Sequence, residues 1–145
     1  MSWLYNEKEF ILAEHDPEPF GYVYEITHTV SGKKYIGKKL LTKAGYKTIK
    51  GKRHKLRLES DWKEYYGSSP ELKKIIEKEG TNNLIRQIVR LCYNRGECSY
   101  YESKMIFETD AIISDNYFNS WISVKVSAAH LNAGKNKKGV DKSSK

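Results

Sequence analysis

The sequence contains few of the residues that build zinc sites, disulfide frameworks or membrane spans. Two of its 145 residues are cysteine, whereas a zinc site needs four ligands, usually in closely spaced pairs. We therefore interpret Cys92 and Cys98 as small core residues. No apolar run approaches the roughly 20 residues of a membrane-spanning helix, and residues 1–8 lack the layout of a signal peptide. These absences favour a cytoplasmic protein with no membrane partner, and the length of 145 residues favours a single main domain.

Acidic residues are absent from one long stretch. Between Lys33 and Arg57 there are 11 lysine or arginine residues among 25, in a chain of formal charge +8. A basic run is often a solvated surface, but this one holds nearly half of the cations and favours phosphate contacts to nucleic acid. We interpret residues 40–55 as a long basic loop or an extended hairpin. The predicted nucleic-acid contacts are Lys33, Lys34, Lys39, Lys43, Lys47, Lys50, Lys52, Arg53 and Lys55.

The stretch before this basic run has the pattern of a β-hairpin. Residues 21–27 alternate with period two, which is typical of a strand. Ser31 and Gly32 supply a turn, because glycine adopts positive φ without a Cβ clash, and residues 34–36 return as a second strand. Tyr24 and Tyr35 therefore lie on paired strands, and the two phenols can meet on one face if the register allows it.

Two helices are predicted after the basic run. A short helix over 60–66 carries Trp62 and Tyr65, whose spacing favours core packing over base stacking. A second helix over 70–79 has Ser69 as its N-cap and proline in its first turn.

A third strand is predicted over 84–92, and it points alternate side chains to opposite faces. Its inward residues are expected to be Ile85, Val89 and Leu91, and its outward residues Arg86 and Arg90. The sequence predicts one domain over residues 1–131. A basic, disordered tail is predicted to follow it over residues 132–145.

The predicted helix over 96–113 carries a carboxylate among apolar positions. Glu102 lies four residues after Cys98 and three before Met105, both of them in an apolar stripe. Burying a carboxylate is costly unless it is paired or binds a metal. The residues alone leave three alternatives open: Glu102 pairs with a cation, lies at the edge of the stripe, or binds a metal ion.

Residues 21–122 resemble the GIY-YIG nuclease family. Gly21-Tyr22-Val23-Tyr24 corresponds to the first half of the family signature with one residue inserted, and Tyr35-Ile36-Gly37 matches the second half. The run through residues 72–89 is similar to the middle of such a domain, with Leu84 in place of an aromatic residue. The resemblance implies an α/β (α+β) fold with a small three-stranded antiparallel sheet, flanked by helices near 60–66, 70–79 and 97–113.

The resemblance also implies a metal-dependent endonuclease that hydrolyses phosphodiester bonds in DNA. It leaves RNA open as a second substrate. Glu102 corresponds to the metal ligand of the family, which would hold Mg²⁺ or Mn²⁺. Tyr24 or Tyr35 would orient or deprotonate the attacking water, and a cation such as Lys38 or Lys39 would favour the phenolate. Asn119 corresponds to the closing amide that helps to arrange the site. We therefore expect Tyr24, Tyr35 and Glu102 to share one concave surface.

Within the family, the closest likeness is to small stand-alone bacteriophage members. This likeness implies that the protein acts in the host cytoplasm, and it leaves open whether the protein forms a homo-oligomer.

The chain departs from the family at one catalytic position. The arginine that usually follows the second tyrosine is replaced here by Lys43-Ala44-Gly45. We expect Arg57 to point into the tyrosine cleft instead, with Arg53 as second candidate and His54 beside it.

Two other functions remain open on the sequence. A non-catalytic nucleic-acid-binding protein that keeps the nuclease fold would use the tyrosines and the basic run equally well. Only Glu102 distinguishes it, because polyanion binding gains nothing from a buried carboxylate. A basic protein that binds acidic proteins is the third alternative.

Overall fold

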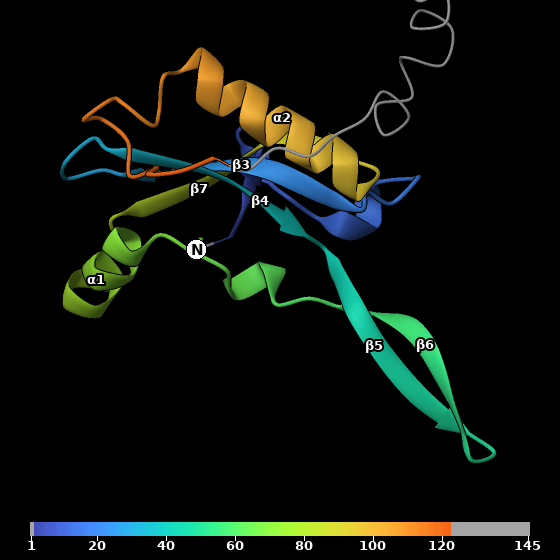
Figure 1. Ribbon diagram of the computed structural model, residues 1–145. Helices are drawn as coiled ribbons and strands as arrows, with labels where there is room; N and C mark the ends of the chain where they lie inside the picture. The colour runs from blue at the N-terminus through green and yellow to red at the C-terminus, as the bar shows by residue number, and fades with distance from the viewer. Residues whose placement is uncertain (1, 123–145) are drawn as a thin grey trace, which may run out of the picture.

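The computed structural model describes residues 2–122, whose body is a mixed sheet between two helical layers (Figure 1). The sheet has the order β2–β1–β7–β3–β4. β3 pairs antiparallel with both of its neighbours, whereas β1 runs parallel to β7. One face is covered by α2 (Arg95–Glu108), and α1 (Pro70–Glu79) packs on the other side. The strands of this sheet are β1 (Leu4–Tyr5), β2 (Lys8–Glu9), β3 (Gly21–His28), β4 (Lys34–Leu40) and β7 (Leu84–Cys92).

The mixed α and β architecture agrees with the sequence, but the predicted three-stranded sheet is wrong in strand number. The N-terminal residues add β1 and β2, which form a short hairpin alongside β7. Trp3 anchors this segment, because its Nε1 donates to the Trp62 carbonyl at 2.6 Å and its side chain is buried. Two-residue strands show no alternation, so no periodicity in the sequence could reveal them.

The sheet separates two apolar clusters, and the alternation predicted for β3 is confirmed. Tyr22, Tyr24 and Ile26 point to one face, and Val23 points to the other. The first face packs against Trp3, Phe10, Trp62 and Leu72. The second face lies beneath α2, where Ile36 and Cys92 of the sheet pack against Cys98 and Ile106 of the helix and against Ala111 after it. The prediction that both cysteines are small core residues is confirmed, since both are free and buried.

β7 turns inward a different set of side chains from the predicted one. Arg86 was expected to face outward, but it is buried together with Leu84 and Ile88. Val89 was expected to face inward, but it is 48% exposed. A slip of one residue exchanges the two faces of a strand. The prediction is therefore wrong for Arg86 and Val89, whereas Leu91 packs against the core and Arg90 is exposed, as predicted.

A β-bulge interrupts the pairing between β3 and β7. Tyr24 pairs with Ile88, whereas the preceding Val23 pairs with Arg90, so Val89 is an extra residue on β7. A bulge leaves one residue unpaired and reverses the alternation beyond it. The sequence pattern treated the strand as unbroken, which is why it could not assign the two faces of β7.

The buried Arg86 ties the chain before α1 to the sheet. Its guanidinium donates to the carbonyls of Lys63 at 2.9 Å and Tyr65 at 2.8 Å. It also lies over the rings of Trp3 and Tyr66, at 4.7 and 4.1 Å from their centroids. These partners compensate for the cost of burying a charge.

The helices agree with the sequence in part. α1 has the predicted bounds, and the Ser69 side chain accepts a hydrogen bond from the Leu72 N–H. α2 begins after the N-cap Asn94 and ends at Glu108, five residues earlier than predicted. The predicted helix over 60–66 is only a 3₁₀ turn, η2 (Trp62–Glu64); a second one, η1 (Leu12–Glu14), lies near the N-terminus.

The basic run forms an extended hairpin, one of the two predicted alternatives. β5 (Thr42–Ile49) and β6 (Lys52–Glu59) pair over their full length in a separate two-stranded sheet. We call this hairpin the arm. Figure 1 shows that it projects away from the body of the molecule. Most of its side chains are exposed.

No helix within residues 2–122 is long and apolar enough to cross a membrane. The predicted basic tail over 132–145, and the domain boundary at residue 131, lie outside the described residues.

Candidate active site

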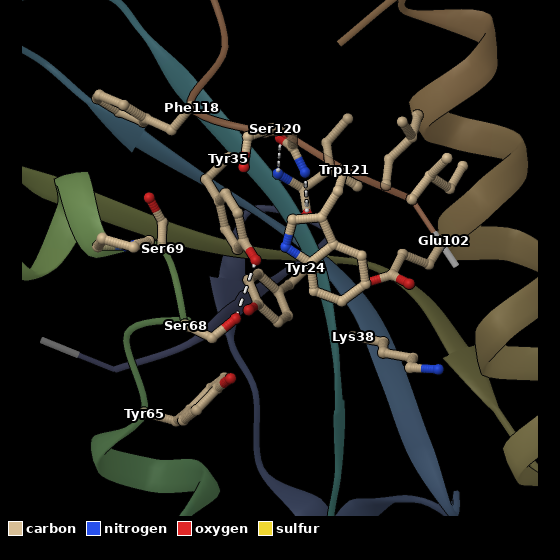
Figure 2. Close-up of a pocket in the computed structure, with 16 residues that line it drawn as sticks. Tyr24, Tyr35, Lys38, Tyr65, Ser68, Ser69, Glu102, Phe118, Ser120 and Trp121 are labelled. Atoms are coloured by element: carbon tan, nitrogen blue, oxygen red, sulfur yellow. Dashed lines mark hydrogen bonds between the residues drawn. The ribbon is translucent and has the colours of Figure 1, made fainter. Parts of the chain in front are cut away.

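A pocket of about 320 Å³ lies where β3 and β4 meet the loop before α1 (Figure 2). Helix α2 and the segment after residue 117 close its other sides. We call it the tyrosine pocket. Five of the predicted catalytic residues line it together: Tyr24, Tyr35, Lys38, Glu102 and Asn119.

The register of β3 and β4 brings the two tyrosines together. Tyr24 pairs with Gly37 and Ile26 pairs with Tyr35, so the tyrosines are diagonal neighbours on one face. Their ring centroids lie 6.2 Å apart. Gly37 is required opposite Tyr24, because a Cβ built there would lie 2.5 Å from the Tyr24 Cζ.

The two phenols have different surroundings. The Tyr35 hydroxyl lies 3.1 Å from Ser68 Oγ, as the dashed line in Figure 2 marks. Burial raises the pKa of Tyr35, and the bond to Ser68 opposes that rise. Tyr24 is more deeply buried, and burial together with the neighbouring Tyr65 and Tyr35 phenols raises its pKa well above the ordinary value. Both phenols are therefore protonated in the free protein at neutral pH.

Glu102 reaches the pocket from the other side of the sheet. Its helix α2 covers the opposite face, but β4 is the edge strand, and the pocket opens beside Gly37 on that strand. Figure 2 shows the Glu102 carboxylate directed from the helix toward the tyrosines. Its charge is close enough to raise the pKa of Tyr35.

The surroundings of Glu102 favour its neutral form. Burial raises the pKa of the carboxyl, whereas the charge of Lys38 and a hydrogen bond from the Lys38 backbone oppose that rise. No ion pair to Glu102 occurs among residues 2–122. The Lys38 ammonium instead donates to Ser99 Oγ at 2.5 Å. Pairing with a cation, one of the three alternatives for Glu102, is therefore not observed in the described part of the chain.

The lysines after the second tyrosine have partners other than the two phenols. Burial is the largest cause of the raised pKa of Tyr24 and of Tyr35, and neither lysine is among the causes. The Lys39 ammonium pairs with Asp61 at 2.6 Å and lies 4.0 Å from the centroid of the Tyr65 ring. Alternation along β4 sends adjacent lysine side chains to different faces, which sequence proximity to Tyr35 does not reveal.

Asn119 holds the second tyrosine strand in place. Its Oδ1 accepts from the Ile36 N–H at 3.0 Å, and its Nδ2 donates to the Ile36 carbonyl at 2.8 Å. The amide thereby satisfies the free edge of β4 between Tyr35 and Gly37. Asn119 is buried, so it acts as a positioning residue for the strand.

Arg57 occupies a neighbouring pocket rather than the tyrosine pocket. Its guanidinium donates to Thr42 Oγ1 at 3.1 Å and to the Thr42 carbonyl at 2.7 Å. This second hollow, which we call the basic pocket, shares Lys38 and Tyr65 with the tyrosine pocket. Its cations are Lys38, Lys39, Lys43, Arg57 and Arg95. The geometry thus differs from the expectation that Arg57 points into the tyrosine cleft.

The remaining predicted residues lie farther away. His54 pairs with Lys47 in the outer half of the arm and lines neither pocket, and Arg53 packs over the Tyr46 ring at 3.9 Å. At the other end of β4, Lys34 pairs with Glu25 at 3.5 Å. Lys33, just before that strand, lies over the Phe118 ring. The other predicted contacts on the arm are exposed: Lys43, Lys47, Lys50, Lys52 and Lys55.

Several residues of the two pockets were not predicted from the sequence. Tyr65 was expected only in the core, and it packs there, but it also lines both pockets. Ser68 and the 72% exposed Trp121 also line the tyrosine pocket. Arg95, the first residue of α2, lines the basic pocket. Their positions depend on folding between distant segments, so no local pattern marks them.

The pocket offers limited means to hold a metal ion. Residues 2–122 contain no cluster of three acidic, histidine or cysteine side chains. The half-buried Glu102 carboxylate is a hard oxygen ligand of the kind that Mg²⁺ and Mn²⁺ accept. Mg²⁺ commonly binds through one or two carboxylates and keeps several waters. The residues therefore fit an ion whose remaining ligands come from water and substrate.

Comparisons with known proteins agree with this geometry. The family model described as "Putative endonuclease segE, GIY-YIG domain" matches residues 3–122. A protein of Enterobacteria phage T4, "Putative endonuclease segE", is 32% identical over 100 residues, which is 69% of this chain. The chain spans only 40% of that relative's length. No solved structure matches the chain significantly. Because the family model covers most of the sequence, the chain belongs to the GIY-YIG endonuclease family of the segE type.

Proposed function

We propose that this protein is a metal-dependent DNA endonuclease that hydrolyses phosphodiester bonds in the tyrosine pocket. The observation that supports the proposal best is the convergence of Tyr24, Tyr35 and Glu102 on one pocket from β3, β4 and α2. A packing role explains buried tyrosines, but it gives no reason for a half-buried carboxylate to line the same pocket without an ion pair among residues 2–122.

Glu102 is the residue that would hold the Mg²⁺ or Mn²⁺ ion. The ion, when bound, supplies positive charge that stabilises the phosphate oxygens during displacement. Glu102 must be ionised to bind it, and burial raises the pKa of that carboxyl. Metal affinity is therefore expected to increase with pH until Glu102 is fully ionised.

Tyr24 and Tyr35 would position the phosphate and the attacking water. A protonated phenol donates a hydrogen bond to a phosphate oxygen, and a phenolate accepts a proton from water. Tyr35 is the less buried of the two, and Ser68 holds its hydroxyl. Tyr24 lies deeper, over Gly37. Either tyrosine can accept the proton of the attacking water in its phenolate form, and a positive charge brought close to the phenol would favour that form.

Cations of the two pockets would hold the substrate. Lys38 borders both hollows, whereas Arg57 and Arg95 lie in the basic pocket only. Their place beside the tyrosine pocket suits phosphates next to the scissile bond better than the scissile phosphate itself. The excess of basic residues along the arm supports a polyanionic substrate, and DNA is the substrate that we propose.

Metal-stimulated nicking of supercoiled plasmid DNA tests the proposal. Glu102→Gln keeps the shape of the side chain but removes the charge, so cleavage should fall at least about a hundredfold while DNA affinity is retained. Glu108→Gln is the matched control, because Glu108 is exposed on the same helix and lines no part of the tyrosine pocket. DNA binding without metal-stimulated cleavage by the unaltered protein would identify a non-catalytic binding protein instead.

A further inference from the structure

The arm has two faces of different character. Residues directly opposite each other in the hairpin share a face, so one face carries Arg53, Lys55 and Arg57 beside Tyr46. We call this the arginine face. Two contacts agree with this assignment of the face. Arg53 covers the ring of Tyr46 and Arg57 donates to Thr42, and both partners lie on the same face. The opposite face carries Lys43, Lys47, Lys52 and His54 together with Ile49, Leu56 and Leu58.

The arginine face runs into the site at its base. Thr42, Ala44 and Arg57 belong to this face and line the basic pocket, to which Lys43 also contributes. That pocket in turn shares Lys38 and Tyr65 with the tyrosine pocket. One cationic track therefore leads from the tyrosine pocket outward along the arm.

We propose that the arm lies in the major groove of double-stranded DNA, with its arginine face toward the duplex, on one side of the scissile bond. This inference rests on the proposed function and adds the substrate class and the direction of binding. The major groove admits a two-stranded β-ribbon. Each strand of the arm has eight residues, which span about 25 Å, or roughly seven base pairs along the duplex.

The chemistry of the arginine face favours a duplex over a single strand. Proteins that bind single strands stack successive bases on a row of aromatic side chains. The arginine face has one aromatic ring, Tyr46, and the guanidinium of Arg53 covers it at 3.9 Å. Double-stranded RNA is also disfavoured, because its major groove is too deep and narrow for side chains to read.

The test compares two double variants of the full-length chain that each remove two exposed cations. Arg53→Ala with Lys55→Ala alters the arginine face, and Lys47→Ala with Lys52→Ala alters the opposite face. Binding of a labelled DNA duplex of about 30 base pairs, several times the reach of the arm, is measured in EDTA across a salt series. Because no metal is present, the result does not depend on whether the protein cleaves DNA.

Loss of two phosphate contacts lowers the slope of log K against log[salt] by about two, which corresponds to roughly 50-fold weaker binding near 0.1 M salt. We expect this loss for the arginine-face variant, and less than about threefold for the opposite-face variant. The difference should disappear on single-stranded DNA and on duplex RNA. Equal losses for the two variants, no loss for either, or the same difference on single strands or RNA would overturn the proposal.

A second substrate separates this inference from the proposed function. Bis(4-nitrophenyl) phosphate is too small to reach the arm, so both double variants should hydrolyse it at the rate of the unaltered protein in Mn²⁺. A loss of hydrolysis in the arginine-face variant alone would place these residues in the reaction and contradict a role in groove binding. If no variant hydrolyses the diester or cleaves DNA, the proposed function fails, while the binding comparison still decides the role of the arm.

Discussion

The tyrosine pocket and the arm differ in how the chain builds them. The pocket gathers Tyr24, Tyr35 and Glu102 from three elements, and a buried amide holds one of its strands. The arm is made from one continuous stretch whose strands pair mainly with each other, and its cations are exposed. Chemistry needs groups fixed to within a fraction of an ångström, whereas phosphate binding sums many loose contacts. A single substitution should therefore disable the pocket, while the arm should lose function gradually.

The largest effect is expected from removing a single pocket hydroxyl. Tyr24→Phe or Tyr35→Phe should lower single-turnover DNA cleavage by at least about a hundredfold in the variant that loses the base. Burial raises the pKa of both phenols. A rate that depends on phenolate should therefore increase with pH across the neutral range, and that increase should vanish in the same variant.

Tyr22→Phe is the control for this comparison. Tyr22 lies on the same strand and face as Tyr24 but does not line the pocket, and its buried hydroxyl has no hydrogen-bond partner among residues 2–122. Its removal should leave the rate unchanged and not lower the melting temperature. Normal cleavage in both pocket variants would show that neither phenol takes part in the reaction.

A smaller loss of cleavage is expected from a substitution that alters the shape of the tyrosine pocket but removes no polar group. In Gly37→Ala the new Cβ would collide with the buried Tyr24 ring. We expect cleavage to fall by about tenfold to a hundredfold, because small displacements of reacting groups are costly. DNA affinity measured in EDTA should stay the same, since the arm is untouched. A parallel loss of affinity would mean that the pocket and the arm are not separable.

Arg57 lies where the two regions meet, so its variants refine the comparison. Arg57→Lys keeps the charge but loses the fork that bonds to Thr42. We expect about threefold weaker DNA binding with an unchanged salt slope, whereas Arg57→Ala should lower the slope by about one. Both Arg57 variants should hydrolyse bis(4-nitrophenyl) phosphate at the rate of the unaltered protein. A defect in turnover greater than that in affinity would return Arg57 to the catalytic role that the sequence suggested.

The smallest effect concerns the stability of the pocket itself. Burial raises the pKa of Glu102 above its value in the unfolded chain, so ionising this group opposes folding. Relative to the unaltered protein, Glu102→Gln should be more stable at neutral pH. The difference in melting temperature should shrink as the pH falls and should vanish below about 4, where an unfolded glutamate is protonated. A difference that grows at low pH would contradict this account of the desolvated carboxylate.

The sequence predicted the parts of the fold that depend on local pattern. Alternation located the two tyrosine strands, and the cap Ser69 with proline after it fixed the start of α1. The three-stranded sheet was wrong, because β1 and β2 are too short to show a period. The predicted faces of β7 were wrong for Arg86 and Val89, because the bulge at Val89 prevents one alternation from holding along the whole strand.

The residues of the candidate site could be predicted where the family signature fixes their spacing in the sequence. They could not be predicted where the packing of distant segments decides which pocket a side chain lines. The two tyrosines and Glu102 share one pocket, as the family resemblance implied, and Asn119 also lines it. The position of Arg57 was not, because the arm carries it into the adjoining basic pocket. Arg95 was missed, since it approaches that pocket from the start of α2, far along the chain.

The most direct test of the proposed chemistry is a crystal of the full-length protein soaked in Mn²⁺. Anomalous diffraction would locate the ion without reference to activity. We expect one strong peak in the tyrosine pocket, within about 2.3 Å of a Glu102 carboxylate oxygen, and we expect Glu102→Gln to lose it. Absence of the peak at Mn²⁺ concentrations that support cleavage, or a peak elsewhere with Glu102 unbound, would contradict the proposed metal-dependent site.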